Sequence, residues 1–296
     1  MTEIPSGQDP GRPHGSTSAH VALLAAVTAG LAGVAGASWA GLMRQARAAT
    51  DAIEAAALAA GTASGTLPEG AEFAWQAVPP SGDGVYLPDG AGPVEHVPDG
   101  ALCLALLGDS TAVGYGCSSA DELPGVVLAR GLTAATGRPV HLTTHGAVGT
   151  GAADLTRQVT AALPDAPDVA VIVVGSNDVR DQIPPRRSAA QLGQAVAALR
   201  AQGVPVVVGT CPDLGVIAPI PQPLRRVVGT WSRLLARMQA REVEAAGGVP
   251  VPIDRLVSPD FYGRPDLFYA DGFHPSGPGY AKAVAALLPE VVAAVR

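Results

Sequence analysis

Residues 101–116 read ALCLALLGDSTAVGYG, an apolar run that stops at Gly-Asp-Ser. Residues 101–107 are apolar throughout, as is most of VAVIVVG at 169–175. Strands covered by helices on both faces have this continuous pattern, whereas half-exposed strands alternate between apolar and polar residues. The stretch therefore predicts a central strand of a parallel sheet, with Ser110 just beyond its carboxyl end.

The rest of the chain repeats this pattern outward from the first strand. Further strands are predicted at 139–144, 168–175, 204–210 and 249–253, alternating with helices at 125–136, 151–163, 188–202, 223–246 and 279–295. Such alternation predicts a three-layer α/β/α sandwich, flavodoxin-like, with about five parallel strands. Ligands of these folds bind outside the carboxyl ends of the strands, so we expect the chemistry in the segments that follow them.

Composition limits the classes of function. The chain has 296 residues, of which 48% are hydrophobic, and a formal net charge of −7. This is enough for one sizeable α/β domain with an appendage. No run of Lys or Arg occurs after residue 50, so we expect no nucleic-acid partner.

The first hundred residues divide into three parts. Residues 1–20 are rich in Gly, Pro, Ser and Thr, which predicts a disordered tail. Residues 21–43 carry no charge, and as a helix they would rise about 34 Å, enough for a bilayer core of ~30 Å. Residues 44–98 read as a helical stretch followed by a Pro/Gly-rich linker, and the compact domain is expected at 99–296.

Three readings of 21–43 stay open. A single membrane anchor is favoured, while a secretory signal cut near Ala35-Gly36-Ala37 and a buried helix are the alternatives. The first predicts possible membrane association and the second a secreted protein. Charges flanking the segment are too few to fix the side of the membrane.

Three cysteines, Cys103, Cys117 and Cys211, lack the CxxC spacing of zinc sites and are too few for a disulfide framework. Buried free thiols are the favoured reading. A Cys117–Cys211 bridge stays open, because both residues would follow strand ends on the same rim.

Four turn-rich segments carry the residue types of acyl-transfer chemistry. They are GDS at 108–110, THGAVGTGAADL at 144–155, GSNDVRD at 175–181 and YADGFHPSGPGY at 269–280. The last places Asp271 three residues before His274, so that the carboxylate can accept from Nδ1–H while Nε2 faces outward. Each segment alone is more typical of an ordinary turn or helix cap, but their order after successive strands favours one shared site.

Together the four segments resemble the conserved blocks of the SGNH hydrolase superfamily, in particular a group of actinobacterial GDSL-type esterases. The resemblance covers about residues 101–296, and it implies the SGNH hydrolase fold for the domain. Ordinary α/β-hydrolases are a poorer match, because no GxSxG motif occurs.

The resemblance implies a role for each block. Ser110 would be the nucleophile, His274 the general base and Asp271 the residue that orients it, with an oxyanion hole formed by Ser110, Gly149 and Asn177. His145 departs from the family pattern in the glycine block, so Gly146 stays an alternative to Gly149. Tyr115, Cys117, Asp213 and Tyr269 lie near the blocks, where packing or turn roles are favoured over lining the pocket.

The function implied is a serine esterase or lipase-type hydrolase that cleaves a small-molecule carboxylic ester through an acyl-enzyme. We expect no cofactor and no metal. Two alternatives stay open: a membrane-anchored O-acyltransferase with the same triad, and a catalytically silent anchored binding module. The acyl and alcohol groups and the oligomeric state are left undetermined by the sequence.

Overall fold

The computed structural model describes residues 17–64 and 80–296, with side chains from residue 38 onward. The chain forms two units, residues 1–46 and residues 47–296. Helix α1 (Thr17–Ser64) contributes to both, and the second unit contains all the strands. Residues 1–16 and 65–79 lie outside the described residues, and with them most of the predicted tail and part of the predicted linker.

The second unit is built on a six-stranded sheet with the order β1-β3-β2-β4-β5-β6. Its strands are β1 (Gly84–Tyr86), β2 (Leu102–Gly108), β3 (Val140–Thr144), β4 (Val169–Val173), β5 (Val206–Gly209) and β6 (Val249–Val251). The last five are parallel in the order expected for a flavodoxin-like sheet, whose direction of winding reverses between β2 and β4. The predicted fold class is confirmed.

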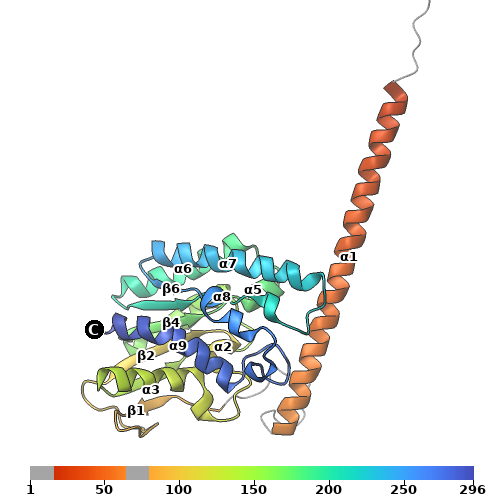
Figure 1. Cartoon of the computed structure of the whole chain (residues 1–296). Helices are drawn as coiled ribbons and strands as arrows, with labels where there is room; N and C mark the ends of the chain where they lie inside the picture. The colour runs from red at the N-terminus through yellow and green to blue at the C-terminus, as the bar shows by residue number, and fades with distance from the viewer. Residues whose placement is uncertain (1–16, 65–79) are drawn as a thin grey trace, which may run out of the picture. The chain divides into compact units, whose positions relative to one another are not determined.

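Helices cover both faces of this sheet, as Figure 1 shows. One face is covered by α3 (Pro124–Thr136) and α9 (Gly277–Ala294), and the other by α4 (Leu155–Ala162), α6 (Pro185–Ala201) and α7 (Leu224–Ala245). Shorter helices follow the strands: α2 (Ser110–Val113), α5 (Ser176–Arg180) and α8 (Ile253–Leu256).

Side chains alternate between the two layers along each strand. Ala105, Leu107 and Ile172 point into a buried cluster with α4, α6 and α7. Leu106 and Val171 point to the opposite layer, under α9, and both are almost fully buried. The continuous apolar runs of the sequence are therefore explained by burial on both faces.

The sheet contains one strand that the sequence pattern missed. β1 pairs antiparallel with β3 at the edge of the sheet and comes from the stretch read as linker. Its three residues are too short for a recognisable periodicity, and the surrounding Pro and Gly residues are typical of turns.

The segment predicted as a membrane anchor, 21–43, lies within α1, and the side chains of its residues 21–37 are outside the described residues. Among the helices of the described residues, none combines the length and the apolar character needed to cross a bilayer. Membrane association and secretion remain predictions.

All three cysteines are free, so the Cys117–Cys211 bridge left open by the sequence is not formed. The Cys117 Sγ lies 3.3 Å from the carbonyl oxygen of Glu122, and the Cys211 Sγ lies beside the carbonyl oxygen of Pro212. Cys117 and Cys211 are buried, and burial raises the pKa of both thiols. Cys103 is only partly buried.

Two buried glutamines bind the backbone at the carboxyl ends of central strands. Gln158 of α4 accepts from the N–H of Gly108 at 2.8 Å and donates to its carbonyl at 2.9 Å. Gln239 of α7 accepts from Cys211 N–H at 2.7 Å and donates to the carbonyl of Val174 at 3.1 Å. These side chains satisfy backbone groups that the sheet leaves unpaired and fix the strand ends.

Replacing Gln158 with Leu should lower the free energy of unfolding by about 1–3 kcal/mol, because the buried N–H of Gly108 loses its acceptor, while the Gly108 carbonyl keeps Ala147 N–H and Thr150 as donors. Denaturant unfolding measures the change. Gln194→Leu, at an exposed position of α6, is the matched control and should change stability by less than about 0.5 kcal/mol. Equal stability of the two variants would contradict this role.

Candidate active site

Ser110 lies at a sharp turn between β2 and α2. Gly108 adopts a φ of 137°, and a Cβ at this position would collide with the backbone carbonyl of Val173. Asp109 caps the short helix by accepting from Thr111 N–H at 2.9 Å. Ser110 is the first residue of α2, so its own N–H has no partner within the helix and is available to an acceptor at the site.

His274 connects Asp271 to Ser110. The Nδ1 of His274 lies 2.6 Å from Oδ2 of Asp271, and its Nε2 lies 3.0 Å from Oγ of Ser110. An ionised carboxylate only accepts, so this contact places the ring proton on Nδ1 and leaves Nε2 free to accept the serine proton. The structure thus brings together the three residues that the sequence predicted as a triad.

Backbone groups hold the Asp271 carboxylate in place. Its Oδ1 accepts from the N–H of Phe273 at 2.8 Å and from that of His274 at 2.9 Å. The Asp271 side chain is fully buried, whereas that of His274 remains 15% exposed. The carboxylate is therefore fixed by its own turn, and the imidazole can still reach the substrate.

Asn177 lies in α5, directly after β4, and its Nδ2 donates to the carbonyl of Thr150 at 2.8 Å. The neighbouring Asp178 accepts from Ala152 N–H, at 3.2 Å to the nearer oxygen. Two contacts therefore tie α5 to the glycine block. A carboxamide has two N–H donors, so one of Asn177 remains for a ligand.

The two candidate glycines of the glycine block have different surroundings. A Cβ at Gly146 would lie 3.0 Å from the Cβ of Ala112 and 3.2 Å from the Gly108 carbonyl, so Gly146 packs behind α2. Gly149 is exposed, has a φ of 80°, and no other group lies within 4 Å of the position of its Cβ. Among the described residues, no acceptor binds the N–H of Gly149. His145 points elsewhere, with its Nε2 2.9 Å from Asp165.

Aromatic rings surround the imidazole. The ring of Tyr115 lies 4.4 Å from that of His274, centroid to centroid, and the ring of Phe273 lies at 5.0 Å. The buried hydroxyl of Tyr280 donates to the backbone carbonyl of Tyr115 at 2.8 Å. Burial raises the pKa of Tyr115, so its phenol stays protonated. Of the pocket candidates from the sequence, Tyr115 packs on the ring of His274, and the N–H of Tyr269 donates to the His274 carbonyl at 2.8 Å.

The other candidates have mostly structural roles. Tyr269 packs edge-on against Tyr115 at 6.0 Å. Asp213 caps a short turn through Gly215 N–H and pairs with Arg233 at 2.7 Å, although it also borders the cavity beside Ser110. Burial raises the pKa of Asp109 and of Asp178, the buried carboxyls next to the site residues.

The described residues contain no group of three His, Cys, Asp or Glu side chains suited to a metal ion.

Sequence comparison relates the chain to known hydrolases. The profile of the GDSL-like lipase/acylhydrolase family matches residues 106–282. A GDSL-like esterase of Mycobacterium tuberculosis is 49% identical over 212 residues, which cover 69% of this chain and 67% of that protein.

Solved structures show the same fold at low sequence identity. An α/β hydrolase from the metagenome of Lake Arreo, Spain, is similar with a TM-score of 0.53 and 18% identity, covering 66% of this chain and 98% of that chain. An acetyl-xylooligosaccharide esterase of Geobacillus is similar with a TM-score of 0.51 and 20% identity, covering 65% and 94%.

The fold, the family profile and the esterase relative agree on one class. The chain belongs to the GDSL-like lipase/acylhydrolase family, and it is a serine ester hydrolase acting on carboxylic esters. The two alternatives, an O-acyltransferase and a silent binding module, are not favoured by these comparisons.

Sequence reasoning missed Gln158 and Thr150, whose hydrogen bonds hold Gly108 and Asn177 in place. Thr150 Oγ1 lies 3.0 Å from the Gly108 carbonyl and 3.3 Å from Nε2 of Gln158, and the carbonyl of Thr150 accepts from Asn177. The sequence signal for Gln158 is that a polar residue stands at helical spacing from Leu155 and Ala162, on the apolar face of the predicted helix.

Replacing Tyr115 with Ala should lower kcat for p-nitrophenyl acetate about two- to tenfold with little change in KM, because the ring that packs on His274 is lost. Steady-state kinetics measures kcat and KM separately. Tyr115→Phe keeps the ring and removes the hydroxyl, so it shows which of the two is needed. Tyr262→Ala, at a position that is 58% exposed, is the control. An unchanged kcat in Tyr115→Ala would show that the ring does not position the imidazole.

Proposed function

We propose that this ester hydrolase works through a triad of Ser110, His274 and Asp271. The observation that carries the proposal is the continuous chain of contacts from Asp271 Oδ2 to His274 Nδ1, at 2.6 Å, and from His274 Nε2 to Ser110 Oγ, at 3.0 Å. Such an arrangement lets a neutral imidazole accept the serine proton and remain paired as an imidazolium.

The reaction has two halves. In the first, Ser110 Oγ attacks the ester carbonyl carbon while its proton passes to Nε2 of His274, and the imidazolium then protonates the departing alcohol. In the second, His274 takes a proton from water as the water oxygen attacks the acyl-enzyme. The carboxylic acid is released and Ser110 regains its proton. Asp271 keeps the ring oriented through both halves.

The oxyanion is assigned three donors: the N–H groups of Ser110 and Gly149 and the Asn177 amide. The open surroundings and unpartnered N–H of Gly149 favour it over Gly146, which is packed against α2. Because Asn177 is already bound to the Thr150 carbonyl, its second N–H is held in place before the substrate arrives. Donors fixed in advance stabilise developing charge without reorganisation.

The substrate is a small-molecule ester, in keeping with the esterase relative. Hydrolysis of p-nitrophenyl acetate tests the triad. The unmodified protein should release p-nitrophenol, and Ser110→Ala should lose this turnover because no hydroxyl remains to be acylated. Turnover that survives in Ser110→Ala at the original rate would contradict the proposal, and circular dichroism verifies that the variant folds.

Asn177→Ala should lower kcat by about 10²–10³, the usual effect of losing one oxyanion donor. Steady-state kinetics measures kcat of Asn177→Ala and of Asn177→Asp. The comparison separates the loss of the N–H donor from the loss of packing, because Asp has the shape of Asn but an acceptor oxygen in place of the amide N–H. If Asn177→Ala retained most of the activity, the oxyanion would have to be bound without this side chain.

A further inference from the structure

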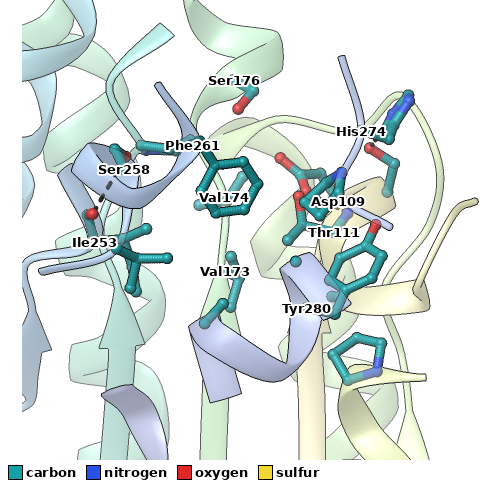
Figure 2. Close-up of a pocket in the computed structure, with 18 of the residues that line it drawn as sticks. Asp109, Thr111, Val173, Val174, Ser176, Ile253, Ser258, Phe261, His274 and Tyr280 are labelled. Atoms are coloured by element: carbon teal, nitrogen blue, oxygen red, sulfur yellow. Dashed lines mark hydrogen bonds between the residues drawn. The ribbon is translucent and has the colours of Figure 1, made fainter. Parts of the chain in front are cut away.

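A buried apolar cavity of about 100 Å³ adjoins the candidate active site. Ser110 and His274 border it, and it extends between the sheet and α9. Figure 2 shows Val173, Val174, Phe261 and Tyr280 around the cavity, with His274 at one side. Apart from Ser110 and His274, the residues that line the cavity belong neither to the proposed triad nor to the proposed oxyanion hole, so the role of the cavity needs a separate explanation.

The walls of the cavity are core residues. Leu106, Leu128 and Val171 form part of the wall and are at most 3% exposed. One face of α9 completes it, with residues spaced three or four apart: Tyr280, Ala283, Val284 and Leu287. From Tyr280 to Leu287 the helix advances about 10 Å at ~1.5 Å per residue, so the cavity wall continues well past the reacting serine.

We propose that this cavity holds the acyl chain of the substrate, and that the enzyme acts on esters of medium-chain fatty acids. The inference rests on the proposed function of Ser110. An acetyl group would leave the part of the cavity along α9 unfilled, whereas an alkyl chain would take up the apolar surface beyond Tyr280. Each buried methylene is worth about fourfold in affinity.

The buried cavity suits the acyl group better than the alcohol. The acyl group stays bound to Ser110 through both halves of the reaction, so an enclosed site stabilises it throughout. The alcohol must leave and water must enter between the halves, which requires an open path. We place this path on the side of the glycine block, where Gly149 is exposed.

Ala283 and Ala285 offer a matched pair of substitutions on one helix. Ala283 lines the cavity, whereas Ala285 is exposed on α9. Ala283→Phe adds a ring into the cavity, and Ala285→Phe adds the same ring to the surface. The measurement is kcat/KM for p-nitrophenyl acetate, butyrate, octanoate and palmitate.

The unmodified enzyme should favour octanoate over acetate by about tenfold or more in kcat/KM and should favour octanoate over palmitate, which exceeds the cavity. Ala283→Phe should reduce the octanoate-to-acetate ratio at least about tenfold, and Ala285→Phe should leave the ratio unchanged. Leu287→Ala, which enlarges the far end, should shift the preference toward longer chains. An identical ratio in Ala283→Phe and Ala285→Phe would overturn the proposal, as would a chain-length preference for the alkyl group of alkyl acetates instead.

A binding measurement separates this proposal from the proposed function. Free octanoate should raise the Tm of the Ser110→Ala protein, and adding Ala283→Phe should abolish the rise. No turnover on any ester, together with this Tm shift, would contradict the proposed function while supporting occupancy of the cavity. Turnover without the shift and without chain-length selection would contradict the cavity assignment alone.

Discussion

The hydrogen bond between Ser110 and His274 is the contact on which the structure of the site depends. Its two residues are 164 positions apart, and their Oγ and Nε2 atoms lie 3.0 Å from each other. The parallel sheet makes this contact possible, because β2 and β6 end at the same edge of the sheet and His274 lies in the segment between β6 and α9. Ser110 comes from the end of β2, and His274 from the turn before α9, which covers one face of the sheet.

The surrounding hydrogen bonds keep the site rigid before a substrate binds. Gln158 fixes Gly108, Thr150 bridges Gly108 and Asn177, and Asp178 binds the backbone of the glycine block. These buried contacts connect three loops from three different strands. Because donors aimed at a developing charge work best when they need not move, we expect this network to assist the proposed catalysis by holding those donors in place.

The sequence was sufficient to predict the parallel sheet and the residues of the triad. The strands were recognisable because burial on both faces makes them continuously apolar, as in residues 169–175. Asp271 and His274 were recognisable because their three-residue spacing allows the contact and because the four segments together resemble the conserved blocks of the SGNH hydrolase superfamily. The strand signal is local, whereas the triad signal lies in the order of four segments along the chain, and both can be recognised before the fold is known.

The features that sequence reasoning missed depend on contacts between distant segments. β1 exists because β3 offers it an edge to pair with, and its own three residues carry no pattern. Gln158 gains its role from the position of Gly108 in space, and the packing role favoured for Tyr115 gains its partner, His274, only in the folded structure. The reading of Cys117 and Cys211 stayed open for the same reason, since only the geometry shows that their side chains have other neighbours.

The most direct test of the account is to react the full-length protein with a fluorophosphonate and to locate the adduct by peptide mass spectrometry. We predict a single adduct on Ser110 that forms quickly in the unmodified protein and far more slowly in His274→Ala, because the imidazole no longer takes the serine proton. An adduct on another residue, or equal labelling rates in both proteins, would contradict the central claim.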